Sequence, residues 1–150
     1  MLAFRKIVDF YIQSSIHVGF AVFCLVQLSV QQWNSYSFLV LFGTIVGYNF
    51  LKYSEWFFST HFFRIQYIGI LVVTLISAIG FSWFFLQQDA TVQLNLILAF
   101  GLVVLYPFVR KIGWLKPFYV SFVVSYITLF VPLKSDVDVI VLFVQRFLLL

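Results

Sequence analysis

Long apolar stretches alternate with short polar joints along the whole chain. Five of these stretches hold enough residues to cross a bilayer: Ile7 to Val30, Ser37 to Leu51 with its flanks, Ile65 to Leu86, Thr91 to Val109 and Pro117 to Leu133. A sixth begins near Val137 and is cut off at Leu150. A helix rises about 1.5 Å per residue, so roughly 20 residues cross a core about 30 Å thick. The pattern predicts an all-α, polytopic membrane helix bundle with five complete spans and a truncated sixth.

Composition supports a membrane protein. The chain of 150 residues is 63% hydrophobic and only 9% charged, which leaves too little polar surface to cover a water-soluble globule. Soluble enzyme folds are therefore excluded. A lone cysteine, Cys24, excludes an intramolecular disulfide and a cysteine-rich metal site. No shift in composition marks a second domain, so we expect residues 1–150 to form one helical transmembrane domain.

The basic residues predict the orientation, because Lys and Arg in short joints remain on the cytoplasmic side. They gather before the first span and in the second and fourth joints, as Arg5, Lys6, Lys52, Arg64, Arg110, Lys111 and Lys116. The first and third joints contain none, and the fifth contains only Lys134. We therefore expect a multi-pass protein of a bacterial inner membrane, with a cytoplasmic N-terminus and membrane lipids as partners. This topology explains the net charge of +4, so no nucleic-acid partner is expected.

The second span carries small and polar residues toward its cytoplasmic end. Gly43 and Gly47 form a GxxxG pair, which lets another helix approach closely. Asn49, Lys52 and Tyr53 share one helical face by their spacing of three and four residues. They form either an interfacial anchor or part of a site at the cytoplasmic mouth. The joint that follows, residues 52–64, is rich in aromatics, so we expect an interfacial helix or a helix extension.

Two other spans contain polar residues within apolar sequence. The first carries a polar-to-small stripe, which predicts a side facing the bundle interior or a water-filled cavity: Asp9, Gln13, His17, Ala21 and Cys24. The alternative is a helix interface with satisfied hydrogen bonds. His17 and His61 have no recognised metal-ligand spacing. Arg146 lies inside the sixth span, where a charge costs several kcal/mol unless paired or hydrated, so it needs a partner in the bundle.

The fourth joint combines a proline with clustered cations. Pro107 follows Tyr106 and should kink or end the helix, because it lacks a backbone donor. Arg110, Lys111 and Lys116 follow closely, and such residues bind phosphate oxygens as a bidentate fork or a point charge. The alternative is a positive-inside loop, which explains the charges but not the Tyr-Pro. We expect this joint to share a cytoplasmic mouth with the end of the second span.

These residues resemble the N-terminal half of the UbiA family of membrane-embedded prenyltransferases. The strongest match is residues 106–111, reading YPFVRK, which looks like the family's Tyr-Pro with paired basic residues at the cytoplasmic end of the fourth helix. Gly47-Tyr48-Asn49 is similar to the start of the family's first aspartate-rich motif. Ser14 to Val18, Phe42 to Tyr53 and Gln145 to Leu150 look like UbiA-related proteins of the Bacteroidetes type.

The resemblance implies prenyl transfer from a polyprenyl diphosphate to an aromatic or other lipophilic acceptor. In the family, two aspartate-rich motifs hold Mg²⁺ on the diphosphate, and nearby basic residues bind the diphosphate oxygens. By this resemblance the diphosphate-binding candidates are Arg110, Lys111, Lys116, Asn49 and Lys52. The candidates for a cavity that holds the prenyl chain are His17, Tyr53, Tyr106 and Arg146.

The sequence departs from the family pattern at the metal site. Where the family has aspartates after Asn49, this chain has Phe50, Tyr53 and Phe57, and Glu55 is out of register. Asn49 and Glu55 are therefore weak metal ligands, and no complete Mg²⁺ site is expected. The chain is either the front part of a UbiA-like transferase, incomplete or inactive as it stands, or a non-enzymatic membrane protein such as a lipid-binding subunit or small transporter.

Overall fold

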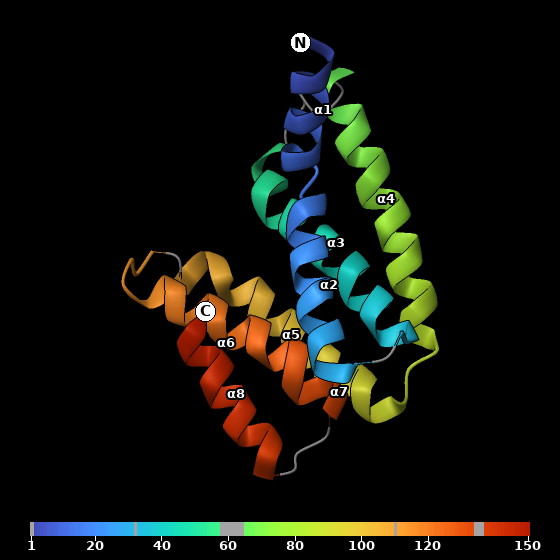
Figure 1. The fold of residues 1–150 in the computed structure, drawn as a ribbon. Coiled ribbons are helices and arrows are strands. Elements are labelled where there is room, and N and C mark those ends of the chain that lie inside the picture. The colour runs from blue at the N-terminus through green and yellow to red at the C-terminus, as the bar shows by residue number, and fades with distance from the viewer. Residues whose placement is uncertain (1, 32, 58–64, 110, 134–136) are drawn as a thin grey trace.

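The structure, a computed structural model, describes residues 2–31, 33–57, 65–109, 111–133 and 137–150, with a few side chains in these ranges left undescribed (Figure 1). Its helices are α1 (Leu2–Gln13), α2 (Ile16–Val30), α3 (Ser35–Phe57), α4 (Ile65–Leu86), α5 (Ala90–Val109), α6 (Leu115–Ser125), the π-helix η1 (Tyr126–Phe130), α7 (Val131–Leu133) and α8 (Val137–Leu149). The predicted all-α class is thus confirmed for the described residues.

Several helices are suited to a bilayer. Three stretches are long and apolar enough to cross it: Ile68–Leu86, Ala90–Val109, and Leu115–Leu133, which runs through α6, η1 and α7. They coincide with the predicted third, fourth and fifth spans. A fourth would be α1 and α2 taken as one bent span. The structure thus supports three membrane-spanning helices, or four with the bent pair, where the sequence predicts five complete spans.

The helices form two groups (Figure 1). α2, α3 and α4 lie side by side. α1 lies past the N-terminal end of α2 and runs beside α4. The second group consists of α5, α6, η1, α7 and α8. The hydroxyl of Tyr36, at the start of α3, donates to the carbonyl of Ile127 in η1 and so links the groups. The main apolar core lies at this junction, with the buried residues Val26, Tyr36, Leu39, Val40, Leu96 and Val131.

α3 and α4 pack closely because each offers a glycine to a ring of the other. A Cβ placed on Gly80 of α4 would lie 2.9 Å from the ring of Phe42. A Cβ on Gly43 of α3 would lie 3.0 Å from the ring of Phe81. Small residues permit this approach in apolar bundles, where van der Waals packing drives helix association. Gly47, the other half of the GxxxG pair, faces Val103 of α5 instead.

The predicted first span is broken in the middle. α1 ends at Gln13, α2 begins at Ile16, and the two helices are bent by 63°. Ser15 has φ 60°, in the left-handed region that non-glycine residues seldom adopt, which interrupts the helical ladder. The expected continuous helix from Ile7 to Val30 is therefore wrong, and the Ser-Ser pair is where it fails.

A polar cap marks the start of α3, and the helix extends into the aromatic joint. Asn34 precedes the helix, and its Oδ1 accepts hydrogen bonds from the backbone N–H and the hydroxyl of Ser37, both at 2.9 Å. This is the N-cap arrangement that satisfies an otherwise orphan helix donor. The helix continues through Phe57, so the aromatic joint begins as the expected helix extension. Residues 58–64, which include Arg64 and His61, lie outside the described part of the chain.

Candidate functional site

The joint between α5 and α6 is a tight reversal that follows Pro107. α5 continues through Pro107 and is described as far as Val109, two residues after the proline. Short backbone hydrogen bonds then form the turn, from Lys111 to Phe108 at 3.3 Å and from Ile112 to Val109 at 2.9 Å. The sequence predicts that Pro107 kinks or ends the helix; α5 passes through Pro107, and the described helix stops two residues later. Lys111 is exposed in this turn.

Two tyrosines fix the helices on either side of this joint. The ring of Tyr106 on α5 lies 6.4 Å from the ring of Tyr119 on α6. The hydroxyl of Tyr119 donates to the carbonyl of Leu102, one turn before Tyr106. Lys116 is exposed at the start of α6. The joint therefore carries two exposed lysines, and the tyrosine contacts hold the helix ends on either side of it together. Arg110 lies outside the described residues.

A second polar region surrounds the break between α1 and α2. The last carbonyls of α1 have no further turn of helix to bond to, because Ser15 leaves the helical conformation. Ser14 and Ser15 are both fully buried, and the hydroxyl of Ser14 donates back to the carbonyl of Tyr11. The freed carbonyls of Gln13 and Ser14 need donors from elsewhere.

The polar face of α3 supplies those donors. Asn49 Nδ2 donates to the Ser14 carbonyl at 3.1 Å, and Tyr53 Oη donates to the Gln13 carbonyl at 2.9 Å. Lys52 Nζ lies 3.4 Å from the same Gln13 oxygen, where its charge also complements the negative end of the α1 dipole. The predicted shared face is confirmed, and it caps a broken helix.

Asn49 does not offer a Mg²⁺ site in this arrangement. It is fully buried, and its Nδ2 also donates to the hydroxyl of Thr74 at 3.0 Å, while its Oδ1 has no partner among the described residues. Mg²⁺ requires near-octahedral oxygen ligands and protein carboxylates, whereas one amide oxygen is a single ligand. The described residues hold no group of three acidic, His or Cys side chains suited to a metal, and the side chain of Glu55 lies outside them. The implied Mg²⁺ does not fit here.

The polar stripe of the first span lies on the outside of the structure. Its members Asp9, Gln13, Ala21 and Cys24 are exposed, so the expectation of an interior-facing stripe is wrong for them. The break between α1 and α2 divides the stripe and turns its two halves differently. His17 is half-buried, with Nδ1 3.4 Å from the Tyr11 carbonyl across the break. The contacts of His17 are local to the break and support no enclosed cavity there.

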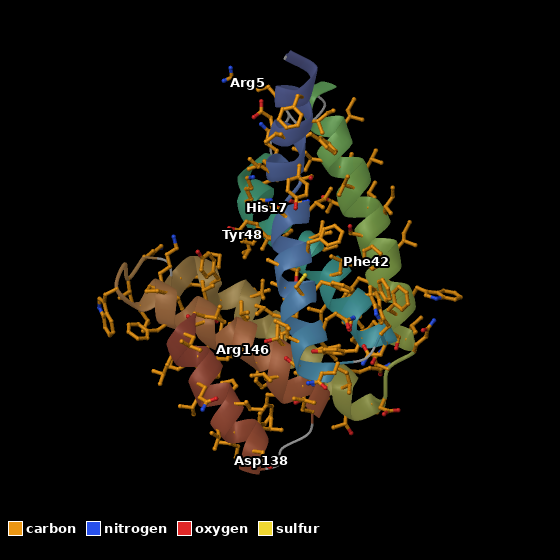
Figure 2. All side chains as sticks on the ribbon, in the orientation of Figure 1. Arg5, His17, Phe42, Tyr48, Asp138 and Arg146 are labelled. Carbon is orange, nitrogen blue, oxygen red and sulfur yellow. The ribbon has the colours of Figure 1, made fainter. Side chains whose placement is uncertain are left out.

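Arg146 has the bundle partners that its position requires. From α8 its Nη1 donates to Ser29 Oγ of α2 at 2.7 Å and to Thr128 Oγ1 of η1 at 3.1 Å. The same nitrogen lies 3.2 Å from the carbonyl oxygen of Leu25. The expectation of a partner inside the bundle is confirmed, and the described partners are neutral oxygens. Arg146 is half-buried, and Figure 2 shows it on α8.

The two predicted halves of a diphosphate site bond to different helices. Gly47 faces Val103 of α5, and Asn49, two residues and about 200° further round the helix, bonds toward α4 and the break. The described hydrogen bonds of Lys52 also go to α1. The described contacts therefore do not join Asn49 and Lys52 to Lys111 and Lys116.

The residues that sequence reasoning missed are serines and threonines. Ser14 and Ser15 form the break, and Ser29 and Thr128 hold Arg146. The adjacent serines in an apolar run were a visible signal of the break. The contact between Ser29 and Arg146 joins positions 117 residues apart, so no local pattern could reveal it.

Comparison of the chain with protein-family models, with curated proteins and with solved structures finds no match. The function is therefore inferred from the residues and their geometry.

Proposed function

We propose that the chain is a UbiA-like integral membrane protein of a bacterial inner membrane, with a cytoplasmic N-terminus and α3 as a further span. Its apolar helices, the Tyr-Pro at the end of α5 and the distribution of Lys and Arg support this proposal. Within it, the joint between α5 and α6 binds the diphosphate of a polyprenyl lipid.

The observation that carries this proposal is the structure of the joint between α5 and α6. Lys111 and Lys116 are exposed where α5 and α6 reverse, and the contacts of Tyr106 and Tyr119 hold the two helix ends together. The neighbouring surface is apolar, with Phe108, Trp114 and Phe118 exposed. Cations beside apolar rings suit a ligand with an anionic head and an isoprenoid tail. In the sequence, Arg110 directly precedes Lys111 and adds a third cation to this joint.

The proposal assigns binding to this chain and no transfer step. Prenyl transfer in the resembled family depends on Mg²⁺ at aspartate-rich motifs, and the residues around Asn49 do not fit that ion. We expect purified chain, Mg²⁺, a polyprenyl diphosphate and aromatic acceptors to yield no prenylated product above an empty-membrane control. Robust turnover would contradict this account of the metal site.

Binding is tested by titrating detergent-solubilised protein with a short prenyl diphosphate and with the matching prenyl alcohol. The diphosphate should bind more tightly, and the difference should shrink as salt screens exposed charges over about 8 to 10 Å. Arg110→Ala should cost more affinity than Lys116→Ala, because a guanidinium forms two parallel bonds to phosphate oxygens. Lys52→Ala is the matched control, since Lys52 caps α1, and it should leave the preference unchanged.

A non-enzymatic role is the second candidate. It is favoured by the use of Asn49, Lys52 and Tyr53 as caps of a broken helix, which accounts for them without a substrate. A lipid-binding subunit or small transporter would have such an architecture. Equal affinity for the diphosphate and the alcohol, unchanged in Arg110→Ala, would favour this candidate and make the joint a topology signal only.

A further inference from the structure

One edge of the Arg146 guanidinium is fixed by neutral oxygens. All three described contacts involve Nη1, and they go to Ser29 Oγ, Thr128 Oγ1 and the Leu25 carbonyl. These acceptors position the group but carry no negative charge. The positive charge of Arg146 is therefore held in place without being neutralised by them.

The two hydroxyls are oriented to accept from Arg146. Ser29 donates its hydrogen to the Leu25 carbonyl at 2.8 Å, and Thr128 donates to the Val124 carbonyl at 2.8 Å. A hydroxyl has one hydrogen, so the side facing Nη1 offers lone pairs. Thr128 is fully buried within η1, and such π-helical turns frequently lie at functional sites. The anchor of Arg146 is thus preorganised.

The other edge of the guanidinium is open. Nε and Nη2 of Arg146 have no partner among the described residues, and neither is among the buried unpartnered atoms. This edge has two parallel N–H groups, the geometry that binds two oxygens of a phosphate or carboxylate. Arg146 therefore offers an unused bidentate fork.

No described carboxylate neutralises Arg146. Asp138, on the same helix, lies eight residues earlier, about 12 Å along the axis, and is exposed. Figure 2 shows it at the opposite end of α8. Asp9 and Asp89 are exposed on α1 and in the joint between α4 and α5. An uncompensated charge within a membrane costs several kcal/mol, so an external anion would be bound favourably.

The surroundings of Arg146 favour an amphiphile over a free ion. Phe143, one turn earlier on α8, packs edge-on against Phe122 at 5.8 Å and Phe130 at 6.4 Å. Most outward residues of α8 are apolar, among them the exposed Leu142 and Leu148, while Asp138 and Gln145 are exposed polar residues. An anion that arrives through this apolar surface needs a tail that is soluble in the bilayer.

We propose that Arg146 binds the phosphate headgroup of a lipid, with Nε and Nη2 each donating to one phosphate oxygen. Its tail lies on the apolar surface of α8. This site is separate from the joint between α5 and α6, because Thr128 follows Lys116 by twelve residues, about 18 Å along the helix. The proposal therefore stands whether or not the joint binds a diphosphate.

The test is a titration of the full chain in detergent with dodecyl phosphate and with dodecanol. Both the wild-type chain and a Lys111→Ala/Lys116→Ala chain should prefer the phosphate at least tenfold. In the Lys111→Ala/Lys116→Ala background, which lacks the lysines of the joint, Arg146→Met should remove the preference. Arg146→Lys should retain part of it, because an ammonium is a point charge without a fork. Inorganic phosphate at equal concentration should not displace dodecyl phosphate, since the tail contributes to binding.

Three binding results would overturn the proposal. Equal affinity for dodecanol would mean that the guanidinium is only hydrated. A preference lost in Lys111→Ala/Lys116→Ala but kept in Arg146→Met would assign it to the joint, and displacement by inorganic phosphate would identify a free-ion site. Should Arg146→Met not fold, the ¹⁵Nε resonance of Arg146, assigned by its absence in Arg146→Lys, provides the decision. It should shift with dodecyl phosphate and not with dodecanol, and no shift overturns the proposal.

Discussion

Asn49 is a buried amide whose hydrogen bonds decide between two interpretations. A metal ligand presents its oxygen to the ion, but Asn49 uses its Nδ2 to hold the Ser14 carbonyl and the Thr74 hydroxyl. The carbonyl of Ser14 is only an acceptor, so the amide nitrogen must face it. The geometry therefore assigns Asn49 to the support of the helix break.

Asn49→Ala should lower the free energy of unfolding by about 1 to 3 kcal/mol, because buried acceptors lose their donors. Asn49→Asp should be at least as damaging, since a carboxylate cannot donate to the Ser14 carbonyl. Unfolding in mixed micelles measures both effects. Gln145→Ala removes an exposed amide and should stay within about 0.5 kcal/mol. If Asn49→Asp instead gained stability with added Mg²⁺, the metal-ligand interpretation would be restored.

Ser15 provides a second test of the break. Its φ of 60° costs a non-glycine residue about 1 to 2 kcal/mol, and its buried hydroxyl has no partner in the part of the chain that the structure describes. Ser15→Gly should therefore leave stability unchanged or raise it by up to about 1 kcal/mol. Ser14→Gly should lower it, because Ser14 lacks a positive φ and its hydroxyl bonds to Tyr11. Thermal unfolding of the two variants should differ in this order, and a loss in Ser15→Gly would contradict the strained turn.

At the scale of elements, α3 and α4 are joined by reciprocal glycine and phenylalanine contacts. Gly80→Ala should cost about 1 to 3 kcal/mol, because its Cβ would meet the Phe42 ring at 2.9 Å. Gly101→Ala is the matched control, since nothing lies within 4 Å of the added Cβ. There the better helix propensity of alanine should give a gain of up to about 1 kcal/mol. Equal unfolding midpoints for the two variants would show that the close packing contributes nothing.

The extent of the helices was largely predictable, and their bends were less so. Apolar runs separated by polar joints predict α4 and α5 almost to the residue, because membrane helices need length and hydropathy above all. The break at Ser15 depends on a backbone conformation that composition does not reveal. The grouping of Asn49 with Lys52 followed from helical spacing, but their partners, the carbonyls of Ser14 and Gln13, are freed only by that break. Likewise, the sequence predicted that Arg146 needs a partner, but only the tertiary packing identifies Ser29 and Thr128 as its partners.

At the scale of the molecule, the predicted orientation requires the two ends of α5 to lie on opposite sides of the membrane. The helix has 20 residues and spans about 30 Å, the thickness of a bilayer core. Asp89 precedes the helix and Ile112 lies in the joint that follows it, and both residues are exposed. These two positions therefore report directly on whether α5 crosses and in which direction.

Single cysteines at these positions test the orientation once the exposed Cys24 has been replaced by serine. In intact cells an impermeant thiol reagent should label Asp89→Cys, because the joints without Lys or Arg are expected outside. Ile112→Cys should react only after permeabilisation, since the cations around it hold that joint in the cytoplasm. Labelling of Ile112→Cys alone would invert the topology. Labelling of both positions from outside would mean that α5 does not cross, and the apolar surface of the second helix group would then need an explanation other than lipid.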